Sequence, residues 1–236
     1  MSDATAAGNA LVDCARLSRS YPDGKERIHA LVDFTYRFVG GSMIAVTGPS
    51  GSGKSTLLAL IAAMDYADSG EVHVGGTELG SLSTVEQAEI RATHVSYLFP
   101  SWNLIPVLSV YENLSLALSR KQLAEPVIDA RIKETLEYLN VSEIAHRRPV
   151  DLSSGQRARA ALARAIAVGN PVLVADEPTA HLDRENSRVV ADLLRSVASD
   201  PLRVVIVATH DALVAETAHE RIDLRDGRIA GSQAAR

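Results

Sequence analysis

A glycine-rich loop between an apolar strand and an apolar helix constrains this chain more than any other segment. The loop follows the strand pattern "SMIAVT" and leads into the helix pattern "STLLALIAAM". The candidate binding residues of the loop and the helix start are Gly48, Pro49, Ser50, Gly51, Ser52, Gly53, Lys54, Ser55 and Thr56. Their spacing fits G-x-x-x-x-G-K-[ST]. Glycines allow backbone N–H groups to surround an anion, and the dipole of the following helix adds positive charge at the same place. The loop therefore predicts an α/β fold that binds a nucleoside triphosphate. A flexible Gly/Ser linker is the alternative.

Two acidic residues after a second apolar strand suit the same site. Lys54 is placed to reach the β- and γ-phosphates, and the Ser55 hydroxyl is placed to ligate Mg²⁺. In "VLVADEP" the apolar strand ends at Asp176, where a carboxylate would hold Mg²⁺ through water. Glu177 would then polarise the attacking water as a general base. The alternative is a pair of exposed loop acids without a catalytic role.

The composition is that of an ordinary globular protein. Of the 236 residues 46% are apolar and 22% are charged, and the net charge of -5 argues against nucleic acid as the main partner, because such surfaces are usually basic. The single cysteine, Cys14, has no intrachain disulfide partner, which suits a reducing compartment. Residues 1–10 lack a basic start and an apolar block, so they predict a disordered tail and not a secretion signal. The longest apolar run, 57–64, is far shorter than the roughly 20 residues that span a bilayer.

The order of the patterns predicts one domain over residues 11–230, followed by a short tail at 231–236. Strand patterns dominate the first part ("HALVDFTYRF", "SMIAVTG", "GEVHVGG"), with a hairpin turn at Gly75-Gly76. Helical patterns separated by prolines then predict a subdomain inserted at about 100–165. The apolar segments "PVLVAD" and "RVVIVAT" predict parallel strands buried on both faces and joined by a helix. Asp226-Gly227 suits a last hairpin turn.

A third segment, "LSSGQRARAALARAIA" at 152–167, carries the resemblance to a known family. It is similar to the LSGGQ signature of ATP-binding cassette (ABC) ATPases, and the resemblance extends over about residues 12–230. It implies the ABC ATPase fold, a P-loop NTPase fold with a mostly parallel core sheet, an antiparallel β subdomain and an inserted α-helical subdomain. It also implies that Ser153, Gly155 and Gln156 bind the γ-phosphate of ATP held by a second subunit in a head-to-tail dimer. The alternative is a simple N-cap before an amphipathic helix.

Three further segments follow the order of that family. Tyr21, in "RSYPDG", resembles the aromatic residue that stacks on adenine. The alternative is a tyrosine buried in the core, because a single aromatic residue in the sequence is compatible with either role. The segment "AHLD", at 180–183, resembles the loop that touches the opposite subunit. His210 follows the strand "RVVIVAT" and resembles the histidine that senses the γ-phosphate, whereas packing or solvation is the alternative for a lone histidine.

Two positions depart from the family pattern. Pro100, in "LFPSWNLIP", stands where the family has a glutamine that contacts Mg²⁺ and the attacking water, and proline has neither a side-chain oxygen nor an N–H group. Ser154 stands at the first glycine of the signature, where serine is unstrained only if φ is negative. We expect a slower ATPase from the loss of the glutamine.

The segment "SWNLIPVLSVYEN" bears on the partner. In similar proteins it lines a groove that receives a short helix from a membrane subunit, and Trp102, Leu104 and Ile105 would form an apolar docking face. The same three residues would equally fill the interior of the helical subdomain. The sequence leaves both possibilities open.

The resemblance implies an ATP-hydrolysing subunit of a membrane ABC transporter, or of a complex that transmits force across the membrane. Its cofactors would be ATP and Mg²⁺, and its partners a membrane-spanning subunit and a second ATP-binding subunit, on the cytoplasmic side of the membrane. The pattern is most similar to the lipoprotein-release, macrolide-export and cell-division subgroup. A low-turnover switch gated by ATP is the alternative. The acidic balance disfavours a soluble ABC protein that acts on DNA or ribosomes.

Overall fold

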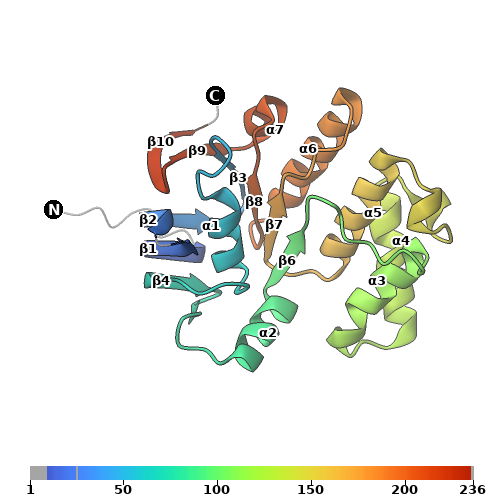
Figure 1. Cartoon of the computed structure of the whole chain (residues 1–236). Coiled ribbons are helices and arrows are strands. Elements are labelled where there is room, and N and C mark those ends of the chain that lie inside the picture. The colour runs from blue at the N-terminus through green and yellow to red at the C-terminus, as the bar shows by residue number, and fades with distance from the viewer. Residues whose placement is uncertain (1–9, 25, 235–236) are drawn as a thin grey trace.

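Two β-sheets and a group of helices make up the residues that the structure describes, 10–24 and 26–234 (Figure 1). The structure is a computed structural model of the chain. A six-stranded sheet lies at the centre, a four-stranded sheet lies on one side of it, and a helical subdomain lies on the other. The central sheet therefore connects the two flanking parts.

The central sheet has the strand order β10-β9-β3-β8-β7-β6. Its strands are β3 (Ser42–Thr47), β6 (Val95–Leu98), β7 (Val172–Asp176), β8 (Val204–Ala208), β9 (Glu220–Arg225) and β10 (Arg228–Ala234). All neighbours pair in parallel except β10, which runs antiparallel to β9 at the edge. The predicted mostly parallel core sheet is confirmed. The hairpin at Asp226-Gly227 is confirmed as well, because Arg225 pairs with Arg228 across it.

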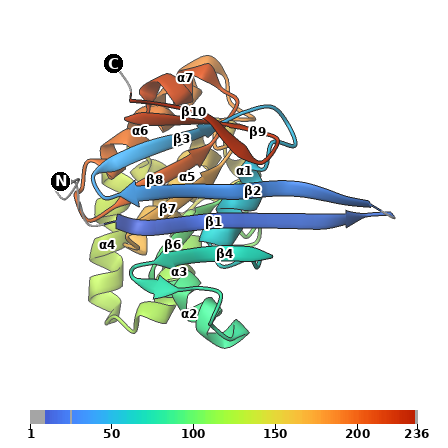
Figure 2. The same ribbon diagram turned by 90° about the vertical axis from the view of Figure 1, so that its left-hand side faces the viewer.

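A four-stranded antiparallel sheet, in the order β2-β1-β4-β5, forms the β subdomain. Its strands are β1 (Ala10–Asp23), β2 (Glu26–Val39), β4 (Ser69–Val74) and β5 (Thr77–Glu78), and Figure 2 shows the two long ones side by side. The hairpin predicted at Gly75-Gly76 is confirmed by the pairing of Val74 with Thr77. The strand patterns of the sequence do not include β1, because register shifts between Cys14 and Leu17 break its two-residue alternation.

Seven α-helices lie in the part of the chain that the structure describes, and the first ends at Ile61, three residues before the end of the pattern predicted over 55–64. They are α1 (Lys54–Ile61), α2 (Thr84–Thr93), α3 (Val110–Leu118), α4 (Glu125–Tyr138), α5 (Ser154–Ala167), α6 (Arg184–Ala198) and α7 (Ala212–Thr217). Short 3₁₀ turns occupy Ser119–Lys121, Ser142–Ile144 and Pro149–Asp151. Ser83, Ser109 and Ser153 each start a helix with a capping box, which satisfies N–H groups that the first turn leaves free. Helices α3, α4 and α5 pack together as the inserted subdomain (Figure 1).

Both faces of the central sheet are covered at β3, β7 and β8, which is why these strands are apolar along almost their whole length. Ala45 and Val207 point to one face and pack with residues of α5, α6 and the helical subdomain. Val46 and Ile206 point to the other face and pack with residues of α1 and the β subdomain. The C-terminal ends of the parallel strands are therefore held between two packed layers, in a fixed relation to α1.

Trp102 and Leu104 lie within the first of these two cores. Trp102 is 7% exposed, and Leu104 packs against the same cluster. The guanidinium of Arg157 lies 5.5 Å from the Trp102 ring centroid, while Arg164 donates to the carbonyl oxygens of Trp102 (3.1 Å) and Asn103 (2.6 Å). Packing inside the subdomain is therefore the role that these two residues take. Ile105, the third member of the expected docking face, is partly exposed.

The predicted tails need two corrections. Ala10 begins β1, so it does not belong to the tail predicted at 1–10, and residues 1–9 lie outside the described residues. Residues 231–234 continue β10 instead of forming a tail, because their backbones pair with β9. In the described part of the chain, no helix combines the length and the apolar character that a bilayer crossing requires.

Candidate active site

The glycine-rich loop leads from β3 into α1 and borders a cavity of about 770 Å³. Residues predicted from four separate segments line this cavity: Tyr21, Gly48, Pro49, Ser50, Gly51, Gly53, Lys54, Ser55, Thr56, Glu177 and His210. Ile28 and Ala30 of β2 complete the lining and are not among the predicted residues. Ser52 is buried at 3% exposure, and its hydroxyl has no hydrogen-bond partner within the described chain.

Two glycines of the loop have no room for a side chain. Gly48 has a φ of 148° and Gly53 a φ of 102°, values that favour glycine. A Cβ atom on Gly48 would overlap the carbonyl oxygen of Leu224 in β9, and one on Gly53 would overlap that of Ala30 in β2. The path of the loop between these two strands therefore requires glycine at both positions.

Lys54 and Ser55 form the first turn of α1. Lys54 Nζ donates to the carbonyl oxygens of Gly48 (2.8 Å) and Pro49 (3.1 Å), which holds its charge over the loop. The Ser55 hydroxyl donates to Asp176 Oδ1 at 3.3 Å. A hydroxyl beside a carboxylate suits Mg²⁺, because this ion takes hard oxygen ligands and often only one or two from the protein, with phosphate and water completing the shell. The donor set of Ser55 and Asp176 therefore fits the predicted ion.

Tyr97 is a neighbour of this pair that the sequence patterns do not indicate. It lies on β6, beside β7, and donates its hydroxyl to Asp176 Oδ2 at 3.4 Å. Burial raises the pKa of Asp176, and the charge of Glu177 raises it further, against the hydrogen bond from Ser55. Burial also raises the pKa of the Tyr97 hydroxyl, which therefore remains a donor. Pro100 follows in the turn after β6 and has no polar side-chain atom.

Glu177 and His210 meet at the ends of adjacent parallel strands. Glu177 follows β7, His210 lies two residues beyond the end of β8, and Asp176 pairs with Ala208 between these strands. The Nδ1 atom of His210 lies 2.9 Å from Oε2 of Glu177, and the His210 backbone N–H donates to the same oxygen at 3.4 Å. The His210 side chain is 72% exposed and that of Glu177 only 20%, so the histidine faces outward from the pair.

The signature segment forms the start of α5, away from the cavity. Ser153 caps the helix: its hydroxyl accepts from the N–H of Gln156, and the Gln156 side chain accepts from the N–H of Ser153. Ser154 does not have a positive φ, so serine is unstrained at this glycine position. Gly155 is buried against Asn186 of α6, and a Cβ atom there would overlap the Asn186 amide. None of Ser153, Gly155 and Gln156 lines the cavity of its own chain, within the residues that the structure describes.

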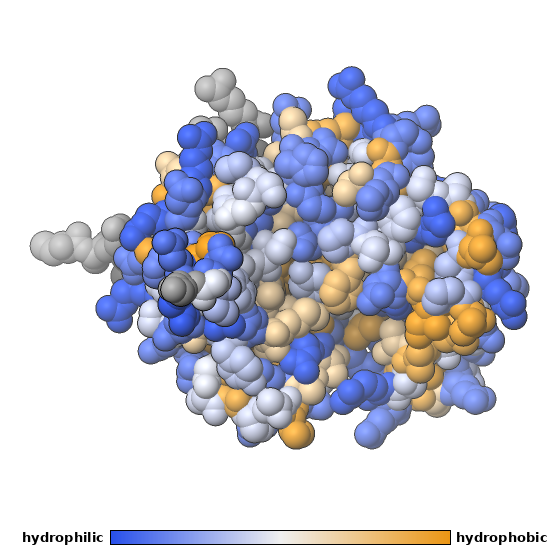
Figure 3. All heavy atoms as spheres, in the orientation of Figure 1, coloured by the Kyte–Doolittle hydropathy of each residue, from blue (hydrophilic) through white to orange (hydrophobic). Residues whose placement is uncertain are grey.

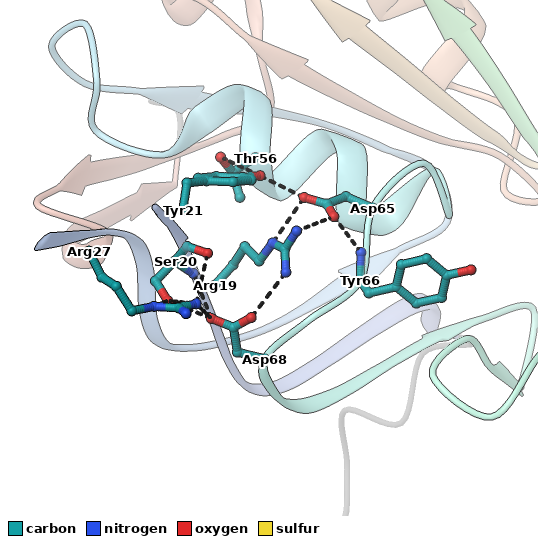
Figure 4. A network of polar contacts seen from close by, with 8 residues as sticks. All are labelled: Arg19, Ser20, Tyr21, Arg27, Thr56, Asp65, Tyr66 and Asp68. Carbon is teal, nitrogen blue, oxygen red and sulfur yellow. Dashed lines mark hydrogen bonds and ion pairs between the residues drawn. The ribbon is translucent and has the colours of Figure 1, made fainter. Parts of the chain in front are cut away.

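Tyr21 lies on β1 opposite Ile28 of β2. It is partly exposed and lines the cavity, so the alternative of a fully buried tyrosine is wrong. Its hydroxyl donates to Asp65 Oδ2 at 2.6 Å and lies 3.5 Å from Thr56 Oγ1 (Figure 4). The aromatic ring therefore borders the same cavity as the glycine-rich loop and Glu177.

Comparison with known proteins agrees with this geometry. The family model described as "ABC transporter" matches residues 31–180, more than half of the chain. The chain belongs to the ABC transporter family. An ABC relative from Methanocaldococcus jannaschii, the uncharacterised ATP-binding protein MJ0796, is 34% identical over 223 residues, or 93% of this chain and 95% of MJ0796. The macrolide export ATP-binding/permease protein MacB of Salmonella typhimurium is also 34% identical, over 93% of this chain. The chain spans only 34% of the length of that MacB.

Solved ABC structures share the fold. A dimeric structure of MJ0796 in a post-hydrolysis state, bound to ADP and Pi, has a TM-score of 0.88 and 32% identity, and the match covers 96% of this chain and 99% of that one. CbiO1 from Clostridium perfringens, part of the transporter complex cbiONQ, has a TM-score of 0.86 at 25% identity. The ABC ATPase fold and the ATP-binding, ATP-hydrolysing function predicted from the sequence are confirmed at the level of the family. The alternative of a low-turnover switch is not favoured by these relatives.

Proposed function

We propose that this ABC ATPase works as one half of a head-to-tail dimer that closes on two ATP molecules and moves a membrane-spanning partner from the cytoplasmic side. One observation carries the proposal. The cavity of the chain contains the loop, Lys54, Glu177 and His210, whereas the turn formed by Ser153 and Gly155 lies elsewhere in the same chain. A second copy would bring that turn to the phosphates, and the site is incomplete without it.

We assign binding of the triphosphate to the glycine-rich loop and Lys54. The loop N–H groups and the start of α1 favour an anion, and the ammonium of Lys54 already lies 2.8 Å from the Gly48 carbonyl at the loop. Ser55 and Asp176 are the residues that would hold Mg²⁺, which neutralises charge on the phosphates when bound. The Tyr97 hydroxyl keeps Asp176 oriented from the other side.

We assign the hydrolysis step to Glu177 and His210. The Glu177 carboxylate would accept a proton from the water whose oxygen attacks the γ-phosphorus, while the bond from that phosphorus to the bridging oxygen breaks and ADP leaves. His210 binds Oε2 of Glu177 at 2.9 Å, which leaves Oε1 for the water. His210 would thereby orient the base and, being exposed, reach the γ-phosphate.

The dimer is supported by the chemistry of the signature turn. Ser153 and the N-terminal N–H groups of α5 form a second site suited to an anion, at the start of a helix of 14 residues. Two structures of the relative MJ0796 are described as dimeric, one of them with ADP and Pi. A dimer of identical chains is the simplest arrangement for this protein, because each copy would offer one cavity and one turn.

A membrane-spanning partner is supported by the surface of the helical subdomain. Figure 3 shows apolar side chains gathered on the right-hand part of the molecule, where Figure 1 shows the helical subdomain. Large apolar residues of the subdomain that are at least half exposed are Val107, Leu116, Val127 and Val150. The relative MacB is by name both an ATP-binding protein and a permease, and this chain covers about a third of it. This likeness supports a proposal in which the ATPase works together with a membrane-spanning permease unit.

Replacement of Glu177 by Gln tests the proposal. The variant keeps the shape of the side chain but removes its basicity, so ATP with Mg²⁺ should trap a dimer that the parent chain releases after turnover. Size-exclusion chromatography with light scattering measures the mass, and released phosphate measures turnover. Glu216→Gln, at an exposed position of α7, is the matched control and should behave as the parent does.

Two outcomes separate the alternatives. A Glu177→Gln chain that stays monomeric at saturating ATP and Mg²⁺, also with its membrane partner present, would show that ATP does not join two copies. Equal dimer lifetimes for the parent and for Glu177→Gln would instead favour the switch with little turnover.

A further inference from the structure

The ring of Tyr21 has two faces with different neighbours. The Arg19 guanidinium carbon lies 4.9 Å from the ring centroid, so a cation covers one face. Tyr21 lines the cavity but Arg19 does not, which means that the covered face is turned away from the cavity. Figure 4 shows the ring edge-on, with the Arg19 side chain on one side of it. The opposite face of the ring is therefore the one available to a ligand.

The hydroxyl of Tyr21 is fixed as firmly as the ring. It donates to Asp65 Oδ2 at 2.6 Å, and Asp65 lies four residues beyond Ile61, the end of α1. Helix α1 starts at Lys54, beside the phosphate-binding loop. The hydroxyl also lies 3.5 Å from Thr56 Oγ1 in the first turn of α1, so Tyr21 of the β subdomain is held against both the start of this helix and the turn that follows it. These two contacts fix the ring relative to the phosphate-binding loop.

Arg19 and Asp68 hold Asp65 and the strand around Tyr21. Arg19 binds both oxygens of Asp65, from Nη2 at 2.6 Å and from Nε at 3.0 Å, in the planar fork that makes such pairs strong. Its Nη1 donates to Asp68 Oδ1 at 3.0 Å. The other oxygen of Asp68 accepts from the backbone N–H (2.8 Å) and the hydroxyl (2.6 Å) of Ser20, the neighbour of Tyr21. The Arg19 and Asp65 side chains are 22% and 19% exposed, so water screens them less than a surface pair.

We propose that Arg19 and Asp65 are positioning residues for the nucleobase, which hold Tyr21 with one face closed and the other open for stacking. The inference rests on the proposed function, because a base reaches Tyr21 only if the loop binds the phosphates. The Tyr21 hydroxyl is engaged by Asp65, so the base meets a π-face together with the apolar side chains of Ile28 and Ala30. Neither Arg19 nor Asp65 touches the nucleotide; both act through Tyr21.

Two ligands that differ only in the nucleoside test the proposal. Calorimetry would give dissociation constants for ATP and for inorganic tripolyphosphate, each with Mg²⁺. Tyr21→Ala should weaken ATP binding at least about fivefold and leave tripolyphosphate binding unchanged, because only the stack is lost. Asp65→Asn should weaken ATP binding by about three- to tenfold, again without an effect on tripolyphosphate. Tyr21→Phe loses only the hydroxyl and should shift ATP affinity in the same direction by less.

A double variant and a control variant distinguish the positioning of Tyr21 from a general effect of the substitutions on the structure. Tyr21→Ala/Asp65→Asn should bind ATP no more weakly than Tyr21→Ala alone, because Asp65 has nothing left to position. Asp13→Asn removes a β1–β2 ion pair with Arg37 (2.9 Å) that does not involve Tyr21, and it should bind both ligands as the parent does. Equal losses for both ligands in Asp65→Asn, or additive losses in the double variant, would overturn the inference. A parent chain that binds neither ligand would refute the proposed function itself.

Discussion

The Nδ1 atom of His210 lies 2.9 Å from Oε2 of Glu177, across the ends of two adjacent parallel strands. The backbone prepares this contact. Glu177 has a φ of 47°, in the left-handed region that non-glycine residues seldom occupy, and its N–H donates to the Ala208 carbonyl at 2.9 Å. Such conformations cost about 1–3 kcal/mol and persist where the surrounding structure enforces them, commonly at functional sites.

His210→Ala should reduce turnover far more than ATP binding. If the imidazole orients Glu177 and contacts the γ-phosphate, its loss removes an interaction needed in the transition state, and a decrease of about 100-fold is in the range for such groups. Phosphate release measures turnover, and calorimetry measures ATP affinity. His29→Ala, an exposed histidine of β2, is the control. Unchanged turnover in His210→Ala would remove the histidine from the mechanism.

Pro100→Gln should accelerate hydrolysis. The substitution restores a side-chain oxygen at the position where the resemblance places one near Mg²⁺ and water, and it removes the fixed φ of proline after β6. Steady-state phosphate release as a function of Mg²⁺ concentration measures the effect. An unchanged rate together with an unchanged Mg²⁺ dependence would show that Pro100 does not limit the parent enzyme.

Tyr97→Phe should weaken the Mg²⁺-dependent part of ATP binding. The variant keeps the ring but loses the hydroxyl that lies 3.4 Å from Asp176 Oδ2. We expect the Mg²⁺ concentration for half-maximal ATP binding to rise by about three- to tenfold, the effect of one lost hydrogen bond. ATP affinity measured in EDTA should stay that of the parent, because no metal is then bound. A loss of equal size with and without Mg²⁺ would point to altered packing of β6 instead.

Gly155→Ala should destabilise the chain and displace the signature turn. The added methyl group overlaps the side-chain amide of Asn186, which cannot turn aside cheaply because it also donates to Asp183 Oδ2 at 2.8 Å. Overpacking of this kind costs about 1–3 kcal/mol of the free energy of unfolding, which urea denaturation measures. Gly155→Ala/Asn186→Ala should recover much of that loss. A double variant as unstable as Gly155→Ala would mean that the strain lies within α5.

Asp68 should make stability depend on pH in the acid range. Hydrogen bonds from Ser20, followed by the charge and hydrogen bond of Arg19, lower the pKa of Asp68 from 3.8 to about 2. The ionised group therefore stabilises the fold above about pH 3.8, and this contribution disappears as the pH falls toward about 2. Asp68→Asn should be less stable than the parent at pH 7 and lose less further stability between these limits. Parallel stability curves for the two proteins would show that the carboxylate contributes nothing.

The sequence predicts the parts of the fold and site that local patterns determine. The glycine-rich loop, the two acids at the end of β7 and both hairpin turns depend on residues adjacent in the chain, and the structure places them where expected. The interaction of Tyr21 with Asp65 joins residues 44 positions apart and has no local pattern. Tyr97 is equally invisible, because its role depends on which strand lies beside β6. Strand β1 is missed because its register shifts break the regular two-residue alternation by which a strand is recognised in a sequence.

The burial of Trp102 shows a second kind of limit. Its apolar neighbours suit a docking face and an interior equally well, and the decision comes from arginines of α5, more than fifty residues later in the chain. A side chain's exposure is a property of the folded neighbourhood, so composition alone leaves such a choice open.

Helix α5 joins two regions that are otherwise far apart. It begins at the Ser153 turn, and near its other end the Ala165 carbonyl accepts from Ser96 of β6 while Arg164 holds the backbone of Trp102 and Asn103. Its 14 residues form a rod of about 21 Å. If a second copy tilts α5 at the Ser153 turn, the helix would move as one rigid body. The movement would therefore reach β6 at the edge of the central sheet and the segment that leads into the helical subdomain.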